Sequence, residues 1–121
     1  MTRFLVATDS VHATAAACDY LDGRLESDDS VRAVAVAGED TTARDAAEAL
    51  NVLTVRLPTA DATTATREGD PVAEIRAAAA DFDADELLLV ASEAPDASAL
   101  GATGGTLLDS VSIPTVVVRA P

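Results

Sequence analysis

The strongest indication of the fold class of this chain is the apolar run Leu87-Leu88-Leu89-Val90-Ala91. Polar residues bound it on both sides, with Asp85-Glu86 before it and Ser92-Glu93 after it. A run that is apolar at every position is typical of a strand covered on both of its faces, as strands are in the middle of a parallel sheet. The run therefore predicts an α/β protein, in which strand and helix patterns alternate along the rest of the chain.

The segment before this run has the sharpest helix-start signal in the sequence, Glu68-Gly69-Asp70-Pro71. Gly69 allows a turn, Asp70 can cap a helix, and Pro71 suits the first helical position. We therefore predict a helix over residues 71–82. Its buried side would consist of apolar residues at helical spacing, namely Val72, Ile75, Ala79 and Phe82.

Two further strand patterns lie near the start of the chain. Residues 3–8 include an apolar run that ends at Asp9-Ser10, and apolar residues then recur at helical spacing over residues 11–26. Residues 31–37 are rich in valine and end at Gly38, which predicts a second strand.

The segment over residues 41–57 is ambiguous. The β-branched residues Val52, Thr54 and Val55 favour a strand, whereas the spacing of the apolar residues favours a helix. We predict one helix over the whole segment. Residues 61–67 then form a weak strand, which its polarity places at an edge of the sheet.

The end of the chain supplies the last helix and strand. Residues 103–112 carry apolar side chains at helical spacing, Pro114 ends that helix, and residues 115–119 form a valine-rich strand. The chain is thus predicted to be a single domain over residues 1–121. Its sheet would have five parallel strands in the order 3-2-1-4-5, with helices on both faces.

The predicted binding crevice lies between the strands over residues 3–8 and 86–91, where the strand order reverses. Ligands of parallel α/β sheets bind outside the carboxyl ends of the strands at this point. The residues that leave the two strands are Thr8-Asp9-Ser10 and Ala91-Ser92-Glu93.

Composition limits the classes of function. Hydrophobic residues make up 49% of the chain and aromatic residues 2%, so we expect a core of Ala, Val and Leu. The formal net charge is −13, and all eight basic residues are Arg. Such a chain repels nucleic acid and anionic membranes, so neither is an expected partner. Abundant Asp without Lys indicates a halophilic protein of a salt-rich cytosol, and an acidic mesophilic protein is the alternative.

The sequence also indicates where the protein is located and which kinds of chemistry to expect. No apolar run is long enough to span a bilayer and no signal-peptide pattern is present, so we expect a cytoplasmic protein. Cys18 is the only cysteine, which excludes a disulfide within the chain and favours a small buried side chain. His12 is expected to face solvent. The sequence shows no Ser/His/Asp or Cys/His set and no metal cluster, so we do not expect an enzyme.

The succession of these segments resembles the universal stress protein family over essentially the whole chain. The resemblance implies an adenine nucleotide alpha hydrolase-like, Rossmann-like fold and ATP or another adenine nucleotide as the ligand. It implies further that Asp9 and Thr8 contact the ribose and the phosphate or Mg²⁺ end, and that Val36 lies near the adenine. The residues that carry the resemblance are Phe4–Ser10, Gly69-Asp70-Pro71 with Ile75, Asp83–Ser92 and Gly101–Val118.

The sequence departs from the family pattern in the phosphate loop. Members that bind ATP carry G-x2-G-x9-G-[S/T], whose glycines let backbone N–H groups approach the phosphates. Here Gly101 is kept, but Ala91 replaces the first glycine and Ala102 replaces the hydroxyl residue. Glu93 and Asp96 would repel a triphosphate. The resemblance thus implies a haloarchaeal member with a degenerate motif and a weak site, lined on this side by Ala91, Ser92, Gly101, Ala102 and Thr103.

Two functional hypotheses remain open. The first is a non-catalytic stress-response or signalling domain that binds an adenine nucleotide weakly, with Mg²⁺ entering only with the nucleotide. The second is a ligand-free dimerisation module whose pocket has decayed. Asp9 and the glycine pair also have structural interpretations that involve no ligand. Asp9 can be the N-cap of the first helix, and Gly104-Gly105 can be a loose turn.

The last strand predicts a homodimer. Val116-Val117-Val118 is an apolar run on an edge strand, and such edges favour pairing with another chain. Members of the resembling family pair this strand with its copy across a two-fold axis. The sequence points to no other protein partner.

Overall fold

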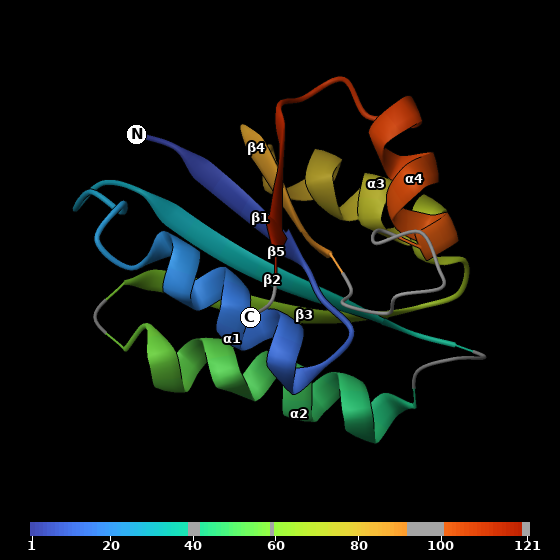
Figure 1. Cartoon of the computed structure of the whole chain (residues 1–121), viewed down its shortest axis with the longest axis horizontal. Helices are drawn as coiled ribbons and strands as arrows, with labels where there is room; N and C mark the ends of the chain where they lie inside the picture. The colour runs from blue at the N-terminus through green and yellow to red at the C-terminus, as the bar shows by residue number, and fades with distance from the viewer. Residues whose placement is uncertain (39–41, 59, 92–100, 120–121) are drawn as a thin grey trace.

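The structure is a computed structural model of the chain and describes residues 1–38, 42–58, 60–91 and 101–119. Five strands and four helices alternate through these residues (Figure 1). In chain order the elements are β1 (Arg3–Ala7), α1 (Val11–Leu21), β2 (Ser30–Ala37), α2 (Ala43–Arg56), β3 (Asp61–Glu68), α3 (Pro71–Phe82), β4 (Glu86–Ala91), α4 (Gly101–Ser110) and β5 (Thr115–Arg119).

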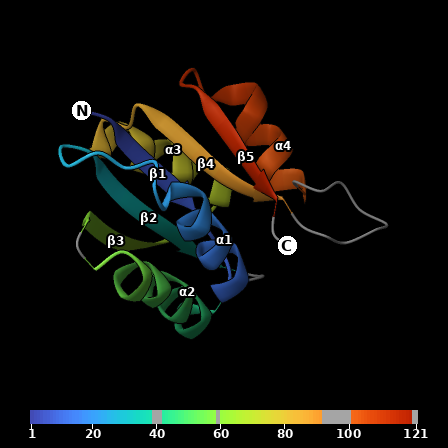
Figure 2. The same cartoon turned by 60° about the vertical axis from the view of Figure 1, so that its left-hand side comes forward.

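The strands form one sheet in the order β3-β2-β1-β4-β5, and every neighbouring pair runs parallel. The predicted fold class and strand order are therefore confirmed. Helices α1 and α2 cover one face of the sheet, and α3 and α4 lie on the other (Figures 1 and 2). β4 has a neighbour on each side, as its unbroken apolar run predicted, and the polar strand β3 stands at an edge.

The core consists of two layers, one on each face of the sheet. Leucines and valines of the strands meet small side chains of the helices, which lets the helices approach the sheet closely. The α1/α2 cluster contains Phe4, Val6, Ala16, Ala17, Cys18, Leu21, Val31, Ala33, Ala35, Ala46, Leu50, Leu53, Leu57, Leu88 and Val118. The α3/α4 cluster contains Leu5, Val34, Ile75, Ala78, Phe82, Leu87, Leu89 and Leu107.

Local signals explain where α2 and α3 begin. Asp70 caps α3 by accepting a hydrogen bond from the N–H of Ala73 at 2.9 Å, and Pro71 occupies the first turn, as predicted. Helix α2 replaces the alternative strand, because its apolar stripe is buried while Val55 remains 70% exposed. Thr42 caps this helix through the N–H of Asp45 at 3.0 Å.

Helix α1 is shorter than the predicted range of 11–26, and that boundary was wrong. The helix ends at Leu21, where the N–H of Asp22 still donates to the carbonyl of Cys18. Gly23 follows with a φ of +81°, a left-handed conformation that glycine adopts without strain. Leu25 nevertheless packs against the α1/α2 cluster from the turn beyond the helix, which is why the helical spacing persisted in the sequence.

Among the described residues, none of the helices combines the length and apolar character that crossing a bilayer requires.

Candidate functional site

The candidate site lies at the carboxyl end of β1, where the strand order reverses. β1 is flanked by β2 on one side and by β4 on the other. The helix that follows β1 lies on one face of the sheet and the helix that follows β4 lies on the other (Figure 2). The connections that leave β1 and β4 therefore run to opposite faces of the sheet. Parallel α/β sheets bind their ligands at such a switch point.

The turn from β1 into α1 contains the predicted residues Thr8 and Asp9. The N–H of Thr8 donates to the carbonyl of Val34 in β2 at 3.0 Å, which extends the pairing of β1 beyond its last strand residue. Asp9 follows and is exposed. Ser10 caps α1, since its Oγ accepts a hydrogen bond from the N–H of Ala13 at 3.1 Å. The interpretation of Asp9 as the cap is therefore wrong, and its carboxylate faces solvent at the edge of the switch point.

The Thr8 side chain points into the protein. Thr8 is 8% exposed, and its Oγ1 lies 2.8 Å from Oγ1 of Thr14, which is 0% exposed. Both hydroxyls also reach the carbonyl oxygen of Ser10, at 3.2 Å from Thr8 and 3.0 Å from Thr14. The contact with a ligand that the resemblance implies for Thr8 stays a prediction, and in this structure its hydroxyl bonds to groups of the supporting turn.

Sequence reasoning missed Thr14. The only signal available was a threonine four residues after Ser10, in a helix whose buried side is otherwise made of Ala, Cys and Leu. A threonine at this spacing commonly bonds to the carbonyl one turn back, so the pattern alone does not reveal a second hydroxyl partner.

The β2 side of the site is formed by Val36 and a close contact of two glycines. Val36 is half-buried and packs, with Ala7, against the α3/α4 cluster. Beyond it, the N–H of Gly69 donates to the carbonyl of Ala37 at 3.2 Å. A Cβ atom on Gly38 would lie 3.3 Å from the carbonyl oxygen of Gly69, so a larger residue would press on the turn after β3.

On the β4 side the structure describes the backbone of the predicted residues in part. Ala91 is the last residue of β4, and Gly101, Ala102 and Thr103 form the first turn of α4. Ser92 lies outside the described residues, as do Glu93 and Asp96. Gly104 and Gly105 belong to α4, so the interpretation of the glycine pair as a loose turn is wrong, and the helix begins two residues before the predicted position 103.

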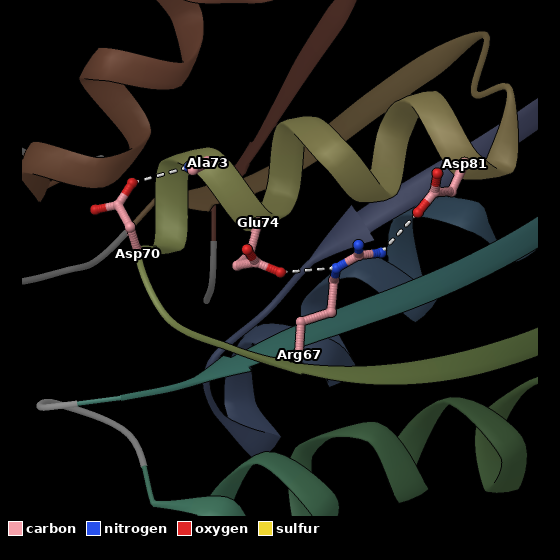
Figure 3. A network of polar contacts seen from close by, with 5 residues as sticks. All are labelled: Arg67, Asp70, Ala73, Glu74 and Asp81. Carbon is pink, nitrogen blue, oxygen red and sulfur yellow. Dashed lines mark hydrogen bonds and ion pairs between the residues drawn. The ribbon is translucent and has the colours of Figure 1, made fainter.

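A charged network lies beside the turn between β3 and α3 (Figure 3). The guanidinium of Arg67 in β3 reaches two carboxylates of α3, with Nε 3.1 Å from Glu74 and Nη1 3.1 Å from Asp81. Its hydrogen bonds to Glu74 and Asp81 raise the pKa of Arg67 above its usual value. This network joins the edge strand β3 to both the first and the last turn of α3, and both carboxylates occupy the guanidinium.

Two further residues that the sequence singled out, His12 and Cys18, lie on α1. His12 is exposed, as predicted. Cys18 is buried on α1, and burial raises the pKa of its thiol to about 11. In the part of the chain that the structure describes, no group of three His, Cys, Asp or Glu side chains is placed to hold a metal ion.

A pocket of about 310 Å³ opens at the opposite end of the sheet, between the ends of α1 and α2. Its walls include Leu21, Leu57 and Asp29, and both oxygens of the Asp29 carboxylate already accept backbone hydrogen bonds. The carboxylate of Asp29 is thus used by the fold itself, whereas Asp9 at the switch point is exposed.

Comparisons with known proteins place the fold. No protein-family model matches the chain, and none of the curated proteins compared with it matches in sequence. Solved structures do match. The universal stress protein UspA from Lactobacillus plantarum is 20% identical with a TM-score of 0.74, covering 98% of this chain and 97% of that one.

Nucleotide complexes are among the similar structures. A universal stress protein family protein from Arabidopsis thaliana with AMP bound is 13% identical with a TM-score of 0.75, covering 100% of this chain and 93% of that one. The universal stress protein from Archaeoglobus fulgidus in complex with dAMP is 15% identical with a TM-score of 0.66, covering 98% of each chain. From its strand order to its crossover helices, this chain has the fold of the universal stress proteins.

Proposed function

We propose that this chain is a universal stress protein-like domain that binds an adenine nucleotide weakly at the carboxyl ends of β1 and β4, and that it acts by signalling rather than turnover. The exposed carboxylate of Asp9 at the switch point is the observation that carries the proposal. A carboxylate can accept hydrogen bonds from ribose hydroxyls, as acidic residues do in dinucleotide-binding sheets. The AMP and dAMP complexes of proteins with this fold support the choice of an adenine nucleotide.

The surroundings of Asp9 favour weak binding. Val36 offers the base a half-buried apolar contact, and the first turn of α4 at Gly101 offers backbone N–H groups to a phosphate. The net charge of −13 opposes the approach of an anionic ligand. A triphosphate meets more of this repulsion than a monophosphate, and Mg²⁺ would enter only as the counterion of the nucleotide, with Asp9 as its contact.

Calorimetric titration in molar KCl tests this proposal with AMP, and with ATP in the presence of Mg²⁺. We expect dissociation constants of roughly 0.1–1 mM, which correspond to binding free energies of about −5.5 to −4 kcal/mol. Asp9→Ala should weaken binding at least fivefold with an unchanged circular dichroism spectrum. Asp22→Ala, which removes an exposed carboxylate at the other end of α1, should leave the affinity unchanged.

Two results would contradict the proposal. Submicromolar affinity for ATP would show that the pocket is not degenerate. Complete absence of binding at millimolar nucleotide would favour a second candidate function, a dimerisation module without a ligand.

The edge strand β5 supports that second candidate. Val118 is buried and Val116 half-buried against the α1/α2 cluster, whereas Val117 is 40% exposed. The N–H of Leu87 donates to the carbonyl of Pro114 at 2.9 Å. The alternation of a parallel ladder then directs the N–H of Val116 toward β4 and that of Val117 away from the sheet. We propose that a second copy of the chain pairs with this outer edge to form a homodimer.

Light scattering on a sizing column in high salt tests the dimer, which should have twice the chain mass of 12.3 kDa. Val117→Pro removes a backbone N–H that points outward, so it should give a folded monomer. Val117→Thr keeps that N–H and should remain dimeric. A wild-type monomer at tens of micromolar would overturn this proposal.

A further inference from the structure

We infer that Thr14 is a positioning residue for Asp9: its buried hydroxyl, paired with that of Thr8, holds the β1–α1 turn in the conformation that presents the Asp9 carboxylate to the ligand. The inference rests on the proposed function, because it assigns a role within the same site. Thr14 itself is fully buried and cannot touch a nucleotide.

The hydrogen-bond arrangement of the turn follows from counting protons. The two hydroxyls lie 2.8 Å apart, so one of their two protons is shared between them. The other proton remains for the carbonyl of Ser10, which lies within reach of both oxygens. That carbonyl also accepts the N–H of Thr14 at 3.1 Å, the first bond of α1. Either direction of the shared proton satisfies every group, so the pair forms a closed network.

This network holds the chain on both sides of Asp9. Thr8 is fixed by its backbone bond to Val34 and by its hydroxyl, and Ser10 is fixed by its carbonyl and by its capping Oγ. Asp9 is the one residue between them, so its Cα–Cβ direction is set although its side chain is exposed. A carboxylate whose backbone is already ordered loses less conformational freedom when it binds.

A purely structural role for Thr14 makes a different prediction. A threonine that only bonds to the carbonyl one turn back would affect the stability of α1 and leave ligand affinity alone. The contact with Thr8, on the strand side of the turn, is what extends its influence to Asp9. A double-mutant cycle that measures the coupling of Thr14 and Asp9 in ligand affinity therefore distinguishes the two roles.

The experiment titrates AMP in molar KCl into the wild type, Thr14→Val, Thr14→Ser, Asp9→Ala and the double variant Thr14→Val/Asp9→Ala. Valine keeps the shape of threonine and removes the hydroxyl. We expect Thr14→Val to raise the dissociation constant roughly three- to tenfold, and Thr14→Ser, which keeps the hydroxyl, to stay within about twofold of the wild type. In the Asp9→Ala background, Thr14→Val should have no further effect.

Cys18→Ala provides the matched control. Cys18 lies one turn further along the buried side of α1, and its truncation should lower the melting temperature without changing AMP affinity. Equal losses of affinity for Thr14→Val with and without Asp9 would overturn the inference.

Amide hydrogen exchange gives a second readout that needs no ligand. The N–H groups of residues 13 and 14 both bond to Ser10, and they should exchange faster in Thr14→Val than in Thr14→Ser. The amide of Leu57, bonded to Leu53 in α2, should not change. Unchanged exchange at residues 13 and 14 would overturn the inference whether or not AMP binds. A wild type that binds no AMP overturns the proposed function alone.

Discussion

The carboxylate of Asp29 fastens the N-terminus of β1 to the turn before β2, since its Oδ1 accepts the N–H of Thr2 at 2.8 Å. Its other oxygen, Oδ2, accepts the N–H of Glu26 at 2.9 Å within the same turn. The backbone hydrogen bonds from Glu26 and Thr2 lower the pKa of Asp29 below its usual value of 3.8. One buried carboxylate thus joins two segments that are 27 residues apart in the sequence.

This carboxylate should make the fold sensitive to acid. A carboxyl group whose pKa is lower in the folded state stabilises the fold above its ordinary pKa and loses that contribution as the pH falls through the folded value. The melting temperature of the wild type should therefore fall as the pH is lowered below about 4. Asp29→Asn should melt lower at neutral pH and show a flatter acid dependence. Asp22→Asn, at an exposed position, should keep the slope of the wild type. An unchanged slope in Asp29→Asn would contradict this assignment.

The Arg67 network should contribute more stability than a simple surface ion pair. Its side chain is 27% exposed and contacts two carboxylates, whereas Arg44 is 87% exposed and contacts Glu48 alone. Urea unfolding at low salt should show a larger loss of stability for Arg67→Gln than for Arg44→Gln, because exposed single ion pairs contribute little. Molar KCl should reduce the difference, because salt screens partly exposed charges. Equal losses for the two variants would show that the second carboxylate adds nothing.

Salt should raise the stability of the whole domain. A net charge of −13 on 121 residues makes self-repulsion large when screening is weak, and the Debye length is ~30 Å at 0.01 M salt but ~3 Å at 1 M. The melting temperature should therefore rise as KCl is increased from tens of millimolar to molar. Scanning calorimetry with KCl and with sorbitol of equal osmolality separates screening from a general solute effect. A melting temperature that does not depend on KCl would contradict the halophile prediction.

The thiol of Cys18 should be protected by the fold. Burial raises its pKa to about 11, so at pH 8 it is protonated as well as inaccessible. Because the thiolate is the reactive form, a disulfide reagent should label the native protein very slowly. Labelling should become fast in urea, at the same urea concentration at which the circular dichroism signal is lost. Fast labelling in native buffer would show that α1 opens locally from the sheet.

Much of the fold could be predicted because several of its elements are determined by a few neighbouring residues. The apolar run of β4 and the sequence Asp70-Pro71 each express one physical requirement within a few residues, namely burial on two faces and a helix start. The end of α1 was harder, since Leu25 is packed against the core from a turn and continues the helical spacing beyond the helix.

The candidate site was less predictable. Asp9 and Ser10 are adjacent and both are good capping residues, so only the extended backbone of Ser10 and its bond to Ala13 distinguish them. The partnership of Thr8 with Thr14 depends on how strand and helix meet, and that of Arg67 with Asp81 on how a helix lies over a sheet edge. Such contacts are set by tertiary packing and leave no spacing signal in the sequence.

The edge strand β5 is mostly apolar, whereas the opposite edge strand β3 is polar and ends in acidic residues. This difference limits how many chains can join into one sheet. If β5 joins two chains into a continuous ten-stranded sheet, each end of that sheet is a copy of β3. Two β3 strands meeting antiparallel in full register would place Asp61 opposite Glu68 at both ends of the contact. Like charges directly opposite each other in a ladder are destabilising. The outer strands would therefore act as terminators, and association would stop at two chains instead of continuing into a fibre.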